Sequence, residues 1–142
     1  MADDEYWNPL APELTVTDLE ASLRFYRAAG FSVRFRREDP PFVYLELGRA
    51  QIMLEEQHAG GWYIGPLDRP LGRGINFQIE VGDAQQTRDA LASIGFAPFR
   101  ELQESWYRVS ETIEEGQGEF LVQDPDGYLM RFSQPLGRRA AT

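Results

Sequence analysis

The sequence lacks cysteine altogether and has a single histidine, His58. Without cysteine there can be no disulfide framework, no thiolate nucleophile and no thiolate metal ligand. One histidine excludes a metal site built mainly from imidazoles, and any Ser–His triad would have to use His58. These absences remove several common classes of hydrolase and metalloprotein from consideration.

Basic residues are scarce: 14 Lys and Arg stand against 23 Asp and Glu, which gives a formal net charge of -9. A protein that binds nucleic acid needs a basic surface, so no nucleic-acid partner is expected. An acidic surface suits a cationic ligand, although it also serves solubility alone.

Long apolar runs are missing as well, since the longest span only four or five residues. A helix that crosses a bilayer needs roughly 20 apolar residues. The acidic start MADDEYWNP also lacks the charged and apolar regions of a signal peptide. We therefore expect no membrane association and a cytoplasmic location.

A repeat divides the chain into two similar halves. Val16-Thr17-Asp18 precedes an amphipathic stretch that ends at Gly30, and Val81-Gly82-Asp83 precedes another that ends at Gly95. Asp18 and Gly30 are twelve positions apart, as are Asp83 and Gly95, and the halves are offset by 65 residues (83 − 18). Acidic residues suit a helix N-terminus and glycines suit its end, so each half is predicted to contain one helix.

One strand is expected before each helix and three after it. The three are predicted at residues 31–37, 42–47 and 51–56 in the first half, and at 97–102, 119–123 and 128–134 in the second. The Asp124-Pro125-Asp126-Gly127 segment is a strong turn signal between the last two strands. One helix covers only one face of a four-stranded sheet. The sequence therefore predicts an α+β fold of two βαβββ modules, with curved mixed sheets around a cleft.

Module boundaries follow from where glycine and proline concentrate. Residues 1–59 are assigned to the first module and residues 74–136 to the second, the two together forming one domain. Residues 60–73 are rich in glycine and proline and are predicted to form a linker loop. Residues 137–142 are predicted to be a frayed tail.

Four stretches carry a resemblance to a known superfamily: LTVTDLEASLRFY (14–26), AGF (29–31), QIMLEE (51–56) and FLVQDPDGYLMRF (120–132). In order and spacing they resemble the vicinal oxygen chelate superfamily, which includes glyoxalase I, extradiol dioxygenases and fosfomycin and bleomycin resistance proteins. The likeness spans about residues 12–136 and is greatest to bleomycin resistance proteins. It implies a homodimer that binds a cationic glycopeptide antibiotic such as bleomycin in clefts at the subunit interface, with no cofactor and no chemistry.

Enzymes of this superfamily place one metal ligand on the first strand and one on the last strand of each module. By the resemblance, these positions here are Ala11, Glu55, Asn76 (or Phe77) and Arg131. Alanine offers no donor, asparagine is a weak ligand, and arginine carries a permanent positive charge. One carboxylate does not make a metal site, so no metal and no catalytic residue are assigned. Glu55 is a candidate ion-pair partner of Arg131 instead.

Aromatic side chains near a cleft suit stacking on a flat heteroaromatic ligand, although they also suit closing a module or dimer interface. Trp62 lies in the linker, and Trp106 lies in the segment between two strands of the second module. Strand aromatics line the cleft if they face its concave side and otherwise belong to the core. The predicted ligand-binding residues are Phe35, Tyr44, Glu55, Trp62, Phe77, Trp106, Tyr107 and Arg131.

Three functions remain open from the sequence: an antibiotic-binding protein, a metal-dependent lyase or dioxygenase, and a sensor of another small molecule. The vacant ligand positions favour the first over the second. Bleomycin binders carry a Trp-Gly pair shortly before the Asp-Pro turn, whereas residues 114–118 here read EEGQG. This departure leaves the identity of the antibiotic open.

Overall fold

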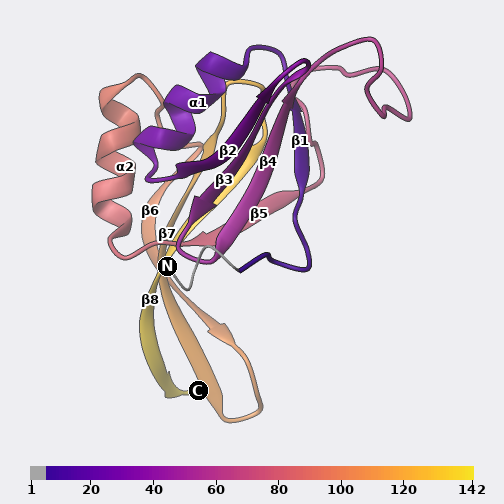
Figure 1. Cartoon of the computed structure of the whole chain (residues 1–142). Coiled ribbons are helices and arrows are strands. Elements are labelled where there is room, and N and C mark those ends of the chain that lie inside the picture. Colours follow the sequence, from indigo (N-terminus) through magenta and orange to yellow (C-terminus); the bar gives the residue numbers. More distant parts are fainter. Residues whose placement is uncertain (1–5) are drawn as a thin grey trace.

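The computed structural model describes residues 6–142; residues 1–5, which the sequence assigns to the first module, lie outside the described part. Each half folds in the order β-α-β-β-β (Figure 1). The first half contains β1 (Glu13–Val16), α1 (Leu19–Ala28), β2 (Ser32–Glu38), β3 (Pro41–Leu47) and β4 (Ala50–Glu56). The second contains β5 (Asn76–Glu80), α2 (Ala84–Ser93), β6 (Arg100–Arg108), β7 (Ile113–Gln123) and β8 (Leu129–Ala140). The predicted α+β fold of two βαβββ modules is confirmed.

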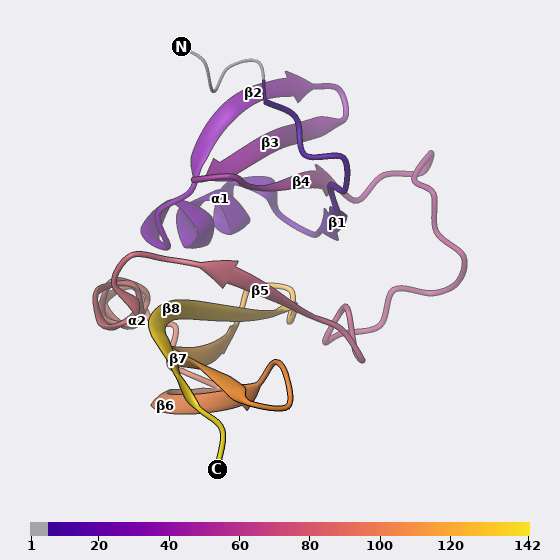
Figure 2. The same ribbon diagram turned by 90° about the horizontal axis from the view of Figure 1, so that it is seen from below.

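The strands form two separate four-stranded sheets, in the orders β1-β4-β3-β2 and β5-β8-β7-β6. In each sheet the first strand runs parallel to the last, while the other neighbours are antiparallel, so both sheets are mixed. Figure 2 shows the two modules stacked, with β5 on the side of the second module nearest the first. The strands β1 and β5 each lie at a sheet edge.

Both helices begin directly after the acidic residues Asp18 and Asp83, as the sequence predicted. The Asp18 side chain accepts a hydrogen bond from the Ala21 backbone N at 3.1 Å, and Asp83 does the same for Gln86 at 3.0 Å. These bonds satisfy backbone N–H groups that the first helical turn leaves without a partner. The helix of each module packs on one face of its sheet, and we call the opposite face the open face.

Alternation along the strands separates the two faces. Paired residues of neighbouring strands point to the same side, and successive residues point to opposite sides. The side chains on the helix-covered faces are buried and apolar: Leu14, Val16, Val43, Leu45, Ile52 and Leu54 in the first sheet, and Ile79, Phe120, Val122, Met130 and Phe132 in the second.

The two modules are joined through the turn between β7 and β8. Asp126 accepts hydrogen bonds from the Thr17 hydroxyl at 2.7 Å and from the Thr17 backbone N at 3.1 Å. The Tyr128 hydroxyl donates to the Thr15 carbonyl at 2.9 Å. The rings of Phe25 and Phe96 meet edge to face with centroids 4.9 Å apart. The residues at the turn between β7 and β8 therefore also hold the second module against the first.

Asp124 in this turn is buried, with 4% of its surface exposed. It accepts hydrogen bonds from the Tyr26 hydroxyl at 2.6 Å and from two backbone N–H groups at 2.9 Å. Burial raises the pKa of Asp124 from 3.8 to about 6, against the opposing effect of these hydrogen bonds. The protonated carboxyl is therefore favoured more in the folded chain than in the unfolded chain.

Asp124 should make the fold less stable as pH rises. Because the pKa of Asp124 is raised on folding, its contribution to the free energy of unfolding is fully present below about pH 4 and is lost as pH rises through about 6. The loss is on the order of 2–3 kcal/mol. Asp124→Asn cannot ionise, so its free energy of unfolding should fall less between pH 4 and 7 than that of the parent chain. Urea unfolding at several pH values measures this difference. Asp68→Asn, at an exposed position, is the control, and identical pH slopes for parent and Asp124→Asn would contradict the assignment.

The second module extends further than the sequence indicated. The outer parts of β6, β7 and β8 form a ribbon that projects from the body (Figure 1), and β8 continues to Ala140. Residues 137–140 thus form a strand instead of the frayed tail that was predicted. Pairing of β8 with β7 as far as Ala140 explains the difference, and two cross-strand ion pairs support it, Arg138 with Glu115 at 2.8 Å and Arg139 with Glu114 at 2.9 Å.

The segment between β4 and β5, residues 57–75, contains no helix or strand, and it spans the stretch predicted as a linker loop. Both helices are ten residues long. Neither helix in the described part of the chain has the length and apolar character needed to cross a membrane.

Candidate functional site

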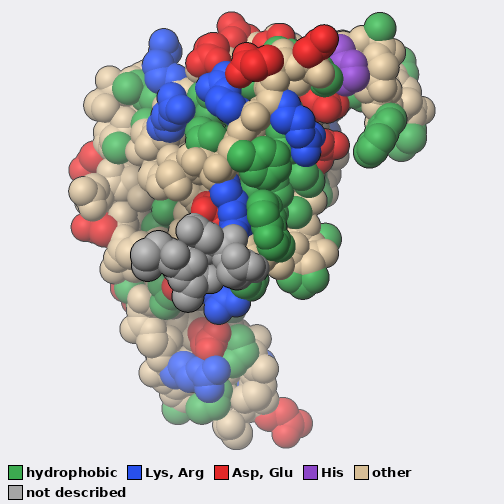
Figure 3. All heavy atoms as spheres, viewed as in Figure 1, with side chains coloured by type: hydrophobic (Ala, Val, Ile, Leu, Met, Phe, Trp, Pro, Cys, Tyr) green, Lys and Arg blue, Asp and Glu red, His purple; other side chains and the backbone are tan. Residues whose placement is uncertain are grey.

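The open face of the first sheet carries a cluster of four aromatic rings, which we call the aromatic face: Trp7, Phe35, Phe42 and Tyr44. Phe35 and Tyr44 stack with centroids 5.4 Å apart and an interplanar angle of 17°. Trp7 meets Tyr44 edge to face at 5.0 Å and is half exposed. Figure 3 shows hydrophobic side chains gathered over this sheet, flanked by basic ones.

Strand register explains why these rings meet. Phe35 pairs with Tyr44 between β2 and β3, and Phe42 lies two residues before Tyr44, so all three side chains point to the open face. Buried Gln51 holds the N-terminal segment beside them, because its side chain accepts from the Asn8 backbone N at 2.7 Å and donates to the Tyr6 carbonyl at 3.1 Å.

Trp7 was not among the predicted site residues. It precedes the first strand by several positions, and nothing in its sequence neighbourhood indicates which sheet face it covers. The guanidinium of Arg34 lies 3.7 Å from the Trp7 ring centroid, a cation–π contact that holds the ring. Arg37 makes a similar contact with Phe42 at 4.3 Å.

Two carboxylates lie beside the aromatic face. Glu55 pairs in register with Phe42, and Glu13 lies on the neighbouring strand β1. Burial raises the pKa of Glu13, the negative charge of Glu55 raises it further, and Arg37 partly opposes both effects. The Glu55 carboxylate also contacts the His58 ring Nε2 at 3.1 Å. A positive group placed between these two carboxylates would relieve their repulsion.

The open face of the second sheet is polar, and its centre is a cluster of four residues that we call the arginine cluster: Arg131, Glu119, Tyr107 and Ser133. Glu119 Oε1 accepts from Arg131 Nε at 2.9 Å and from the Ser133 hydroxyl at 3.1 Å. The Tyr107 hydroxyl donates to Glu119 Oε2. The Arg131 guanidinium lies 5.4 Å from the Tyr107 ring centroid. These contacts come from three adjacent strands of one sheet.

Glu119 is held as a carboxylate although only 2% of its surface is exposed. Burial alone would raise its pKa, but the hydrogen bonds from Tyr107 and Arg131 outweigh burial and hold the pKa of Glu119 below its ordinary value. The ion pair therefore persists at neutral pH.

The structure groups four of the predicted site residues into two pairs. Phe35 and Tyr44 meet on the aromatic face, and Tyr107 and Arg131 meet in the arginine cluster. Glu55 does not pair with Arg131, because each is paired within its own module, with His58 and Glu119 respectively.

The other three predicted residues lie apart from these clusters. Trp62 is 92% exposed in the loop between the modules. Trp106 points to the side of β6 opposite Tyr107, where the Arg139 guanidinium lies 4.1 Å from its ring centroid. Phe77 does not line an open face, because it pairs in register with buried Met130 and packs against the core. The exposed residues on either side of Phe77 are the ones that face outward.

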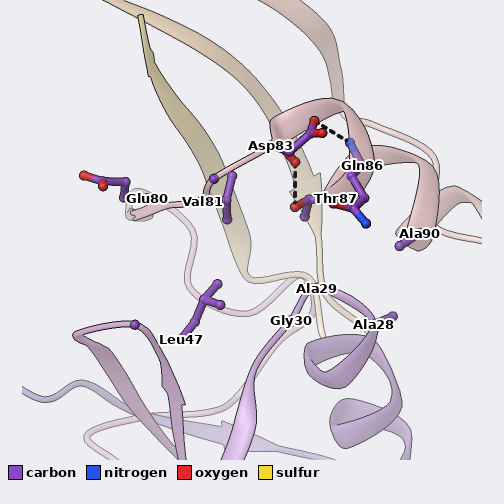
Figure 4. A pocket seen from close by; sticks show the side chains of 12 residues that line it. Ala28, Ala29, Gly30, Leu47, Glu80, Val81, Asp83, Gln86, Thr87 and Ala90 are labelled. Carbon is purple, nitrogen blue, oxygen red and sulfur yellow. Dashed lines mark hydrogen bonds between the residues drawn. The ribbon is translucent and has the colours of Figure 1, made fainter. Parts of the chain in front are cut away.

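A groove of about 520 Å³ lies between the modules, and none of the predicted site residues lines it. In Figure 4, Leu47 of the first module and Val81 of the second point toward each other across it. Two acidic residues, Glu80 and Asp83, line the groove, and Asp83 is already engaged as the cap of α2. Most of the side chains that line the groove are small or apolar.

Residues 8–132 match the family model described as the Glyoxalase/Bleomycin resistance protein/Dioxygenase superfamily. No curated protein matches the chain. Hypothetical protein SA1046 from S. aureus is 20% identical over 94% of this chain and 98% of its own, with a TM-score of 0.63. A glyoxalase/bleomycin resistance protein/dioxygenase from Alicyclobacillus acidocaldarius is 18% identical over 96% of both chains, with a TM-score of 0.62. A bleomycin-binding protein complexed with bleomycin is 22% identical over 90% of this chain and 98% of its own, with a TM-score of 0.56. At these identities the solved structures share the fold alone.

Proposed function

The chain belongs to the glyoxalase/bleomycin resistance protein/dioxygenase superfamily, and within it we propose that this protein binds a flat, cationic small molecule without changing it. A bleomycin-like antibiotic is the ligand class that the proposal names. The ligand stacks on the aromatic face and places its positive charge beside Glu13 and Glu55. Binding of this kind sequesters the compound.

The observation that carries the proposal is the aromatic face itself. Aromatic rings on the open side of a sheet offer a flat apolar surface, and such surfaces suit stacking on a heteroaromatic ring. Glu13 and Glu55 lie beside these rings, and their mutual repulsion favours a cation there. The net charge of -9 attracts such a ligand over longer distances.

The side chains available as metal ligands support a binding function over metal-dependent catalysis. In the described residues 6–142, no group of three or more His, Asp or Glu side chains is arranged to hold a metal ion. Glu55 is the one carboxylate among the four positions that the superfamily's enzymes use. Arg131 places a positive charge at another of these positions, where it would repel a metal cation.

We propose further that two copies of the chain complete the binding cleft. Each open face belongs to a separate sheet, and the edge strands β1 and β5 each have one neighbour within their own sheet. Edge strands with unpaired backbone groups are ready to pair with another chain. A second copy would close each open face into a cleft, with two-fold symmetry producing two equivalent sites.

A thermal-shift screen combined with elemental analysis tests the proposal. Flat aromatic cations, bleomycin among them, are expected to raise the melting temperature, while neutral aromatics of the same size raise it less. Stoichiometric iron, manganese, nickel or zinc in the purified protein would favour the metal-dependent enzyme instead. A response confined to an uncharged metabolite would point to a sensor of another compound.

A further inference from the structure

The arginine cluster has a geometry that an ion pair alone does not require. Glu119 is buried and both of its oxygens are occupied, Oε1 by Arg131 and Ser133 and Oε2 by Tyr107. The side chain of Arg131, by contrast, is 26% exposed against 3% for Glu119. The carboxylate is thus fully used inside the protein, while the arginine reaches solvent.

Only one side of the Arg131 guanidinium is engaged. Its Nε donates to Glu119 at 2.9 Å, and no residue in the described part of the chain accepts a hydrogen bond from either Nη atom. The contacts of Nε and of the Tyr107 ring fix the plane of the guanidinium. Its two Nη atoms are therefore held as a preset pair of donors on the open face.

From this geometry we infer that Arg131 is a binding subsite for a carboxylate group of a small-molecule ligand. The paired N–H donors of a guanidinium match the two oxygens of a carboxylate in a bidentate arrangement. Exposed Gln78 lies beside Arg131 in the parallel register of β5 and β8, so its amide can donate to the same group.

The surroundings of Arg131 favour a ligand group with a single negative charge over one with a double negative charge. Glu119 already offsets the charge of Arg131 at close range, and the chain as a whole carries a net charge of -9. A phosphate dianion would meet one guanidinium and strong repulsion, whereas a planar monoanion gains the bidentate bonds at a smaller electrostatic cost. The ligand class is therefore an organic carboxylate.

This inference deepens the proposed function, since it assigns chemistry to the second open face, and it rests on that function only in treating the open faces as binding surfaces. The aromatic face would take the ring and the cationic group of a ligand, and the arginine cluster would take a carboxylate. The two modules share one topology, yet their open faces present aromatic rings in one case and an arginine in the other.

Side-chain NMR of ¹⁵N-labelled protein tests the subsite with benzoate, with benzamide as its uncharged counterpart, and with inorganic phosphate. The Arg131 Nε–Hε signal, assigned by its loss in Arg131→Gln, is expected to shift saturably with benzoate and at least tenfold more weakly with benzamide. Binding of phosphate as tight as that of benzoate, or equal binding of benzoate and benzamide, would overturn the carboxylate assignment.

Variants separate the subsite from general effects of charge. Arg131→Gln should reduce benzoate affinity to within twofold of benzamide, and Arg131→Gln/Glu119→Gln should do the same without leaving a buried carboxylate unpaired. Arg138→Gln removes an arginine of the projecting ribbon that is also bound through Nε to a glutamate, and it should leave benzoate binding unchanged. Loss of benzoate binding in Arg138→Gln equal to that in Arg131→Gln would refute the subsite. None of these readouts uses an aromatic cation, so they fail or succeed independently of the proposed function.

Discussion

Replacing Phe25 with alanine is expected to lower the free energy of unfolding by about 3–5 kcal/mol, the usual cost of truncating a fully buried phenylalanine. Phe25 has no exposed surface and lies where the modules meet, with its ring 4.9 Å from those of Tyr26 and Phe96. Removing it leaves a cavity that two modules line, so neither can close it alone. Urea unfolding followed by fluorescence measures the loss.

Phe99→Ala is the matched control for Phe25→Ala. Phe99 lies in the second module close to Phe96 in sequence, but it is 66% exposed. Its truncation is expected to change stability by less than about 1 kcal/mol, as for most surface substitutions. A comparable loss for both variants, or a loss below about 1 kcal/mol for Phe25→Ala, would mean that Phe25 does not join the modules.

The second large effect concerns ligand affinity. Phe35→Ala is expected to weaken binding of an aromatic cation such as bleomycin by roughly tenfold to a hundredfold, about 1.4–2.8 kcal/mol. The physical reason is that Phe35 and Tyr44 form the stacked pair at the centre of the aromatic face, and removing one ring opens the surface on which the ligand stacks. Titration calorimetry on parent and variant measures the ratio.

Phe99→Ala again serves as the control, because it removes a phenylalanine from outside the aromatic face. Its affinity should match that of the parent chain. The melting curve of Phe35→Ala shows whether the variant is folded. A folded Phe35→Ala protein with parental affinity would exclude the aromatic face as the binding surface.

The fold could be predicted from local signals that tertiary structure did not override. Asp18 and Asp83 are side-chain caps, and a cap acts on the helix that directly follows it. The turn at residues 124–127 is likewise a local feature. The projecting ribbon could not be predicted in this way, because Arg138 and Arg139 gain their strand conformation from partners more than twenty residues away.

The candidate site could be predicted only in part from the sequence, because it too depends on pairing between strands. Phe35 and Tyr44 could be proposed because strand aromatics are natural cleft residues, but face assignment depends on register. A shift of one residue moves a side chain to the other face, and this is why Phe77 proved to be core while its neighbours face outward. Arg131 was singled out by its position, yet its partner Glu119 required the pairing of β7 with β8.

Titration of the metal-free parent protein with bleomycin, by calorimetry and tryptophan fluorescence, tests the central claim most directly. The account predicts saturable binding with a dissociation constant in the tens of micromolar or tighter, about 6–7 kcal/mol of affinity. It also predicts tryptophan fluorescence that changes on binding, and recovery of the antibiotic chemically intact. Absence of heat and of any fluorescence change at tens of micromolar, or recovery of an altered compound, would contradict it.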